Sequence, residues 1–256
     1  MAHMSLENRV ALVTGAGTGM GRAIALLFAR QGARVFIHYR NSAAAAEEVA
    51  AEIRGAGGAA DLLQADISSE QQIKVLVERI QQSAGRLDIL VNNAGWTRRV
   101  PHTDLAALTD EIWQQTLQTN LLGPFYLTRA ALPLLQQSPG AAVVNIASTG
   151  ALTGMASSIA YVASKAGLLA ITQSFARAFA PQVRFNSIAP GLIRTGFAGW
   201  TEDNYAPGDA AAPLGRLATV EDVAEAALYL ATANVTGEMI VVDAGFYRLG
   251  PRAWGI

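Results

Sequence analysis

The chain has no cysteine, only three histidines and only two lysines, against seventeen arginines, among its 256 residues. The absence of cysteine excludes disulfides, thiol nucleophiles and thiolate zinc sites. One histidine, His3, lies in the opening "MAHM", which we interpret as an expression scar over residues 1–4. Because the other two histidines are far apart in the sequence, we predict no metal site.

A strong net charge and a long hydrophobic run are also missing. The formal net charge is −1 at pH 7, and there is no basic cluster of the kind that binds nucleic acid. No apolar run reaches the roughly 18 residues of a membrane span, and the first residues lack the apolar segment of a signal peptide. We therefore expect a cytoplasmic protein that binds neither nucleic acid nor membranes.

Short apolar runs alternate with longer segments of helical spacing along the chain. The runs predict strands over 10–14, 34–39, 61–66, 88–93, 141–147, 183–189 and 238–244. The helical spacing predicts helices that include 42–54, 69–84, 110–137, 158–180 and 219–232. Strands that are apolar on both faces are typical of a parallel sheet covered by helices on each side. We therefore predict an α/β fold, a doubly wound (Rossmann) parallel sheet of about seven strands, as a single domain over residues 5–256.

Two segments carry a more local expectation. Asn41 or Ser42 is the expected N-cap of the helix over 42–54. The segment 196–213 shows no clear period, and in this architecture such a stretch is usually a lid or a binding loop. We expect it to be the substrate loop.

The first predicted strand leads directly into "TGAGTGMGRA". Glycines at such a turn bring backbone N–H groups close to a phosphate, and the following helix adds the positive end of its dipole. The pattern is T-G-x-x-x-G-x-G, with Gly15, Gly19 and Gly21 as its glycines, while Met20 stands where the common G-x-G-x-x-G has a glycine. A purely structural glycine turn is the alternative, but the position after the first strand favours a dinucleotide.

The end of the second predicted strand bears on the choice of cofactor. A carboxylate there would bind the ribose hydroxyls of NAD, whereas a cation would accept the 2′-phosphate of NADP. Tyr39 occupies the place of the acid and Arg40 follows it, so we favour NADP(H). NAD(H) stays open, with Arg40 as a solvated surface residue. Asp66, at the end of the third strand, is a candidate for hydrogen bonding to the adenine.

Tyr161 and Lys165 are four residues apart in a predicted helix, which places them on one face. Lowering the pKa of a phenol by about 3 units requires roughly 4 kcal/mol. An ammonium about 4 Å away supplies roughly 4 kcal/mol at an effective dielectric constant of about 20. The pair therefore predicts a tyrosine with a lowered pKa that exchanges protons near neutral pH. The alternative is a surface contact without chemistry.

These motifs together resemble the short-chain dehydrogenase/reductase family over nearly the whole chain. The resemblance rests on "TGAGTGMG", "NNAG" at 92–95, Asn120 in "LQTNLLGPF", Ser148 in "VNIAST", "YVASK" and "PGLIRT" at 190–195. The stretch "HYRNSAAAA" is similar to NADP-using pteridine and acyl-carrier-protein reductases of that family. Thr18 departs from the pattern, because NADP-using members often carry Arg or Lys at that position.

The resemblance implies a catalytic set of four residues. Tyr161 would be the general acid/base, and Ser148 would hydrogen-bond the substrate carbonyl. Lys165 would contact the nicotinamide ribose and lower the pKa of Tyr161, while Asn120 would hold a water that links Lys165 to solvent. Reduction of a carbonyl leaves charge on its oxygen, which needs a hydroxyl donor and a proton source together.

The resemblance also implies where the cofactor lies. "NNAG" would border its adenosine half, with Asn92 near the ribose, and Ile193 and Thr195 would touch the nicotinamide carboxamide. The expected cofactor residues are Gly15, Thr18, Gly19, Met20, Gly21, Tyr39, Arg40, Asp66, Ile67, Asn92, Ala94, Gly95, Tyr161, Lys165, Pro190, Gly191, Ile193 and Thr195.

Substrate residues follow from the same resemblance and are mainly apolar or aromatic. This favours a hydrophobic or aryl ketone over a polyol. Arg98 and Arg99 would either bind an acidic group or form a solvated face. The expected substrate residues are Trp96, Thr149, Met155, Trp200 and Tyr205.

The sequence thus predicts an NADPH-dependent carbonyl reductase that assembles as a homotetramer or homodimer, as its relatives commonly do. An NAD-linked alcohol or sugar dehydrogenase working in the oxidative direction is the nearest alternative. A nucleotide-binding sensor or scaffold is the alternative from another class. The apolar end of the tail "RAWGI" would dock on a neighbouring subunit or be disordered.

Overall fold

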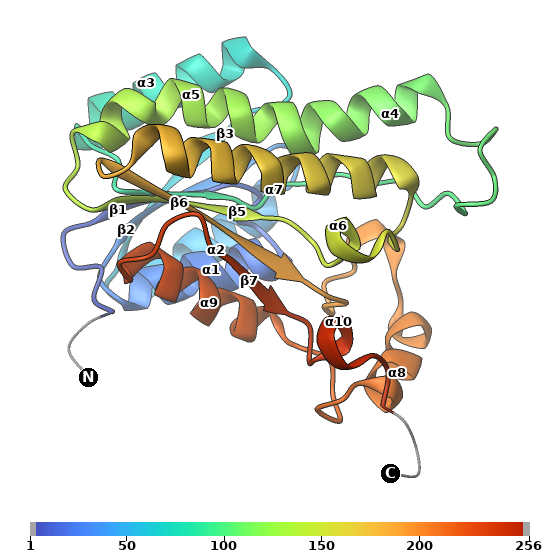
Figure 1. The fold of residues 1–256 in the computed structure, drawn as a ribbon. Coiled ribbons are helices and arrows are strands. Elements are labelled where there is room, and N and C mark those ends of the chain that lie inside the picture. The colour runs from blue at the N-terminus through green and yellow to red at the C-terminus, as the bar shows by residue number, and fades with distance from the viewer. Residues whose placement is uncertain (1–3, 253–256) are drawn as a thin grey trace.

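The computed structural model describes residues 4–252, and these form one seven-stranded sheet between two layers of helices (Figure 1). Neighbouring strands of this sheet pair in parallel, in the order β3-β2-β1-β4-β5-β6-β7. The doubly wound parallel fold is therefore confirmed. The strands are β1 (Val10–Val13), β2 (Arg34–Tyr39), β3 (Ala59–Gln64), β4 (Ile89–Asn92), β5 (Ala141–Ile146), β6 (Val183–Pro190) and β7 (Met239–Val242).

The helices follow the strands in the usual α/β alternation. On one face of the sheet lie α1 (Gly19–Arg30), α2 (Ala43–Gly55) and α9 (Val220–Thr232); on the other lie α3 (Glu70–Ala84), α5 (Gly123–Gln136) and α7 (Ile159–Phe179) (Figure 1). The shorter helices are α4 (Asp110–Leu117), α6 (Gly150–Thr153), α8 (Glu202–Ala211) and α10 (Phe246–Leu249). None of the helices in residues 4–252 has both the length and the hydropathy to span a bilayer.

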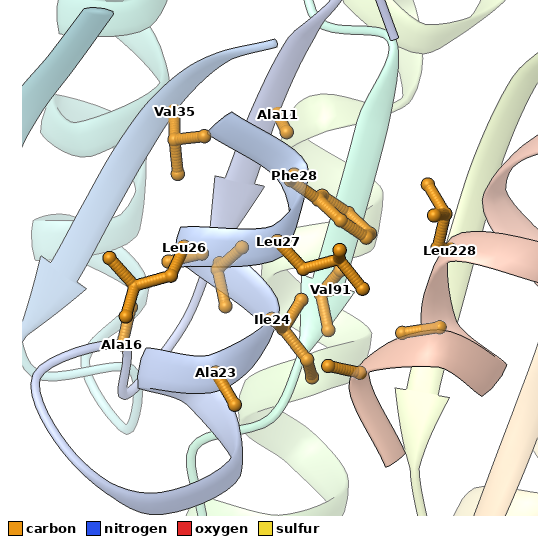
Figure 2. Close-up of a cluster of buried hydrophobic side chains, with 14 of the residues drawn as sticks. Ala11, Ala16, Ala23, Ile24, Leu26, Leu27, Phe28, Val35, Val91 and Leu228 are labelled. Carbon is orange, nitrogen blue, oxygen red and sulfur yellow. The ribbon is translucent and has the colours of Figure 1, made fainter. Parts of the chain in front are cut away.

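The central strands of the sheet, β1, β4 and β5, are buried on both faces because they are mainly apolar. Ala11 and Val13 of β1 pack toward α1 and α9, whereas Leu12 faces the opposite layer. This is the two-residue period of a strand. On the first face, the aromatic ring of Phe28 of α1 lies between Val91 of β4 and the side of α9 (Figure 2).

The strand order places a crevice above the carboxyl ends of β1 and β4. The chain leaves β1 toward β2 on one side, and the later strands continue from β4 on the other. At such a reversal the connecting loops diverge, which opens the site where α/β sheets bind their ligands.

The structure differs from the sequence expectations in the details of several elements. The helix expected over 110–137 is interrupted by a π-helical turn, Gln118–Leu122, between α4 and α5. β3 begins and ends two residues earlier than expected, so that Asp66 lies beyond the strand. Ser42 does stand at the N-cap of α2, but its side chain makes no capping hydrogen bond.

The segment 196–213 is not an irregular loop. It contains a short 3₁₀ turn, Phe197–Gly199, and then helix α8, whose N-cap Thr201 forms a capping box with Asn204. Helical spacing is hard to detect here because Pro207 and Gly208 lie inside α8. The expected docking of the "RAWGI" tail and the interpretation of residues 1–4 as a scar concern positions that, apart from Met4 and Arg252, lie outside the described residues.

Candidate active site

The glycine turn lies at the amino end of α1, in the crevice. Gly15 and Gly19 have positive φ angles of 63° and 54°, a conformation that favours glycine. A Cβ on Gly21 would collide with the carbonyl oxygen of Gly15. No side chain caps the first turn of α1, since Thr18 at the N-cap makes no such hydrogen bond. The first N–H groups of α1 therefore receive no hydrogen bond from the N-cap side chain. Such N–H groups at the start of a helix suit a phosphate.

Asn93 and Thr14 hold this turn against β4. The Thr14 hydroxyl accepts hydrogen bonds from the N–H groups of Asn93 and Ala94, both at 2.9 Å. The Asn93 amide donates to the carbonyls of Thr14 and Gly15 at 2.8 and 3.2 Å. Sequence reasoning missed Asn93, although it stands in the "NNAG" motif.

Asn92 was expected near the ribose, and for its side chain this prediction is wrong. The side chain is 3% exposed and donates to Asn145 Oδ1 at 2.8 Å. Asn145 in turn donates to Thr172 Oγ1 of α7 at 2.8 Å. Because neighbouring residues of a strand point to opposite faces, Asn92 joins a polar network beneath α7 and Asn93 alone turns toward the glycines.

A second part of the crevice lies at the end of β2. A cavity of about 480 Å³ is lined there by Arg40, Asn41, Gln64 and Asp66, among others. Arg40 Nη1 is 3.6 Å from Asp66 Oδ2. Burial would raise the pKa of Asp66, but hydrogen bonds from Ser68 and the charge of Arg40 hold it below its usual value. Arg40 and Asp66, which were expected to contact different parts of the cofactor, form an ion pair in this structure.

Lys165, Ser148 and Tyr161 lie together at the other end of the crevice. The Lys165 ammonium, in a residue that is 3% exposed, donates to the carbonyl of Ile146 at 2.8 Å. Its nitrogen is 5.8 Å from the centroid of the Tyr161 ring. A Cβ on Gly95 would lie 3.8 Å from the same nitrogen, so "NNAG" borders the lysine.

The electrostatics of this end differ from the expectation. Burial raises the pKa of Tyr161 to about 12, although a hydrogen bond with Ser148 acts in the opposite direction. Burial lowers the pKa of Lys165 to about 8. The predicted lowering of the Tyr161 pKa is therefore wrong for this structure, because desolvation dominates and the ammonium is bonded to Ile146.

Asn120 lies in the π-helical turn, and its side-chain amide makes three hydrogen bonds. Its Nδ2 donates to the carbonyl of Trp96 at 2.9 Å and to Ser164 Oγ at 3.1 Å. Its Oδ1 accepts from the N–H of Trp96 at 2.7 Å. The side chain thus ties the segment after "NNAG" to α7, and the water that it was expected to hold stays a prediction.

The segment after β6 closes the crevice over the glycine turn. A Cβ on Gly19 would lie 3.2 Å from the Thr195 side chain. Gly191 packs directly against Asp243, and Ile193 is buried. Of the other expected cofactor residues, Ile67 is buried and Met20 packs against the core around α1.

The five expected substrate residues do not share one environment. Tyr205 is 4% exposed, and its hydroxyl accepts hydrogen bonds from the N–H groups of Thr195 and Gly196 at 3.4 and 3.1 Å. It therefore supports the backbone at Thr195 and Gly196, and its assignment to the substrate is wrong for this structure. Met155, in contrast, is 76% exposed, and Thr149 and Trp96 are half-buried.

Two aromatic contacts extend the site toward solvent. Trp200 packs on Tyr205 with ring centroids 5.7 Å apart, and the Arg99 guanidinium lies 5.1 Å above Trp200. Phe197, which sequence reasoning missed, lies 6.1 Å from the Tyr161 ring between centroids. A second cavity of about 480 Å³ is lined by residues that include Trp96, Arg98 and Arg99.

Comparison with known proteins gives consistent matches over nearly the whole chain. Residues 15–247 match a family model described as enoyl-(acyl carrier protein) reductase. The chain is 40% identical to a Streptomyces violaceoruber protein named as ketoacyl reductase 2 of the granaticin polyketide synthase, over 97% of this chain and 100% of that one.

Two solved structures have closely similar folds. A 3-ketoacyl-(acyl-carrier-protein) reductase from Brucella melitensis, complexed with NADH, has a TM-score of 0.85 and 33% identity, over 94% of this chain and 99% of that one. A protein from Beutenbergia cavernae, named for an NAD(P)-dependent gluconate 5-dehydrogenase and carrying NADP at low occupancy, has a TM-score of 0.87 and 34% identity, over 96% and 99%.

Proposed function

The chain belongs to the short-chain dehydrogenase/reductase family of oxidoreductases, and we propose that it is an NADPH-dependent reductase of ketones with Tyr161 as its general acid. The observation that carries the proposal is the convergence of Tyr161, Ser148 and Lys165 at one end of a crevice whose other end is a glycine turn. The turn fits a dinucleotide, because its glycines leave room for a phosphate against the start of α1.

When bound, a nicotinamide cofactor supplies the hydride. The residues of the chain then manage the charge that develops on the carbonyl oxygen. Ser148 and Tyr161 donate hydrogen bonds to that oxygen, and Tyr161 transfers its proton. A phenol with a pKa of about 12 is fully protonated at neutral pH, which is the form that a proton donor needs.

Lys165 stabilises the phenolate that remains after the transfer. At about 6 Å and an effective dielectric constant of about 20, an ammonium stabilises an anion by roughly 3 kcal/mol. The bond to the carbonyl of Ile146 keeps the ammonium in place, so this stabilisation costs little reorganisation. The lysine therefore acts on the product of proton transfer more than on the resting tyrosine.

Arg40 supports NADPH as the cofactor. Its guanidinium lines the cavity at the end of β2, where a 2′-phosphate would be held, and Tyr39 replaces the acid that would bind NAD. The nearby Asp66 carboxylate, 3.6 Å from Arg40, would repel a phosphate and so favours the alternative, an NAD-linked dehydrogenase. Steady-state constants for NADPH and NADH decide between the two.

The proposed substrate is a small hydrophobic ketone, with 3-oxoacyl thioesters included because relatives are named for ketoacyl reduction. The aromatic residues Trp96, Phe197 and Trp200 around the catalytic end support an apolar substrate. A screen of aryl ketones, keto esters, quinones and a 3-oxoacyl thioester, followed by NADPH absorbance, tests it. Turnover by the parent and its loss in Tyr161→Phe are expected; equal turnover by both would overturn the mechanism.

Assembly as a homotetramer or homodimer and a cytoplasmic location stay predictions. The alternative from another class, a nucleotide-binding sensor or scaffold, would have no use for a buried lysine beside a tyrosine in the crevice. Burial of the Lys165 charge destabilises the fold, so its presence here supports a catalytic role.

A further inference from the structure

His38 is a buried histidine that the proposed reaction does not use. It lies on β2, is 2% exposed, and contacts the two segments that frame the adenosine end of the crevice. Its Nδ1 accepts a hydrogen bond from the N–H of Gly15 at 3.2 Å. Its Nε2 is 3.0 Å from the carbonyl oxygen of Ala65.

The chemistry of the two partners fixes the state of the ring. A backbone N–H only donates and a backbone carbonyl only accepts. Nδ1 must therefore carry a lone pair and Nε2 must carry the proton, so only the neutral Nε2–H tautomer satisfies both contacts. Burial agrees, because it lowers the pKa of His38 to about 4, against the opposing effects of the Ala65 hydrogen bond and the Asp66 charge.

Residue 38 holds the glycine turn through its backbone as well. The N–H of Ala16 donates to the carbonyl of His38 at 3.0 Å. The N–H groups of two consecutive residues, Gly15 and Ala16, therefore both donate to His38. On the opposite side of the turn, the carbonyl of Gly15 accepts from Asn93. The peptide groups around Gly15, whose φ is 63°, are thereby fixed from both sides.

The other contact leads to the cavity at the end of β2. Ala65 lines that cavity and immediately precedes Asp66. Its N–H donates to the carbonyl of Tyr39 at 3.1 Å, and its carbonyl is the partner of the His38 ring. The ring is therefore the side-chain link between the glycine turn and the segment that carries Asp66.

We propose that His38 is a positioning residue for the adenosine diphosphate half of the nicotinamide cofactor. Through its neutral imidazole it holds the glycine turn and the Ala65–Asp66 peptide in one fixed relation, so that nucleotide binding requires little rearrangement. The inference rests on nucleotide binding by this family. It does not depend on the choice between NADP and NAD, or on the reaction catalysed.

Binding of ADP-ribose, which NAD and NADP share as a common part, tests this directly. Calorimetric titration of the parent, His38→Leu and His38→Asn is compared with Phe36→Leu, a buried change on the same face of β2. We expect His38→Leu to weaken binding about tenfold or more, as the loss of one to two hydrogen bonds implies. The His38→Asn variant, whose amide can bond to one of the two partners, should recover part of the lost affinity. The Phe36→Leu variant should lose stability but bind ADP-ribose as tightly as the parent.

Steady-state kinetics separates positioning from general damage to the fold. For His38→Leu the KM for the cofactor should rise about as much as the ADP-ribose dissociation constant, while kcat at saturating cofactor stays within about threefold. Nitrogen NMR of the native protein gives a second readout, with His102 as the internal comparison. The His38 ring should be in the Nε2–H form at neutral pH.

Three results would overturn the proposal. The first is a folded His38→Leu variant that binds ADP-ribose as the parent does, and the second is a His38 ring found charged or in the Nδ1–H form. The third is a drop in kcat with an unchanged cofactor KM. If His38→Leu does not fold, His38→Asn and the NMR measurement decide. If the parent binds neither ADP-ribose nor 2′-phospho-ADP-ribose, nucleotide binding itself fails, whereas loss of the ketone reductase activity alone leaves the inference standing.

Discussion

Lys165 donates its hydrogen bond to the carbonyl oxygen of Ile146, 2.8 Å away, and its nitrogen lies 5.8 Å from the centroid of the Tyr161 ring. Ile146 is the last residue of β5, two positions before Ser148. The carboxyl end of β5 therefore positions both Lys165 and Ser148, the proposed hydrogen-bond donor to the substrate carbonyl. The tyrosine reaches the same place from α7, one helical turn before the lysine.

Replacement of Tyr161 by Phe should remove the proton donor and keep the ring. We expect kcat for ketone reduction to fall by about two to four orders of magnitude, with cofactor binding unchanged. Tyr229→Phe, on the exposed face of α9, is the matched control and should have the activity of the parent. A fall of less than about threefold for Tyr161→Phe would contradict the proposed role.

Arg40→Gln should shift the cofactor preference. A charge-assisted hydrogen bond contributes about 1.5–3 kcal/mol, so kcat/KM for NADPH should fall by about tenfold to a hundredfold while that for NADH changes little. Arg54→Gln removes an exposed arginine that pairs with Glu47 on α2 and should leave both values unchanged. An equal loss for the two cofactors would show that Arg40 does not contact the 2′-phosphate.

Tyr205→Phe should affect the cofactor and leave substrate choice unaltered. The hydroxyl accepts from the backbone of Thr195 and Gly196, so its loss leaves both N–H groups without that acceptor and loosens the segment over the glycine turn. We expect the KM for the cofactor to rise by about threefold to tenfold. Relative rates across a series of ketones of increasing size should keep their order; a reordering would restore Tyr205 as a substrate residue.

The stability of the protein should depend on pH through His38. In the unfolded chain this histidine takes up a proton near pH 6.5, but in the folded chain only near pH 4. Between these values the unfolded state binds more protons, so the free energy of unfolding falls as the pH falls. Asp66 is the charged group facing the ring, and its own pKa is lowered, so it stays ionised over this range.

Urea unfolding at pH 7 and pH 4.5 measures this effect. The loss attributable to His38 should be roughly 2–3 kcal/mol, and His38→Asn should remove it. His102→Asn is the control, because it leaves the His38 ring in place. The same pH dependence in the parent and in His38→Asn would show that His38 is not the group responsible.

Asn145→Ala should destabilise the fold. The side chain joins Asn92 of β4 to Thr172 of α7 in a buried network, and its removal leaves both partners short of a hydrogen bond. We expect a loss of about 1–3 kcal/mol in the free energy of unfolding. Asn234→Ala, at an exposed position after α9, should lose less than about 0.5 kcal/mol.

The sequence by itself determined the alternation of strands and helices, the glycine turn and the pairing of Tyr161 with Lys165. These features depend on residues that are near one another in the chain, where the periods of 2 and 3.6 and the needs of a tight turn act locally. The strand Arg34–Tyr39 was predicted residue for residue. The interruption of the helix 110–137 was not, because π-helical turns have no simple spacing signal.

Tertiary structure decided which side chains face the crevice and what charge they carry. Asn92 and Asn93 are adjacent in the same motif, yet only the packing of β4 beside β5 turns one toward Asn145 and the other toward Gly15. Likewise, the pKa of Tyr161 follows from how much apolar protein surrounds it, and the partner of Lys165 is a carbonyl nineteen residues away. Burial and long-range hydrogen bonds are properties of the assembled layers, and for that reason no local pattern could supply them.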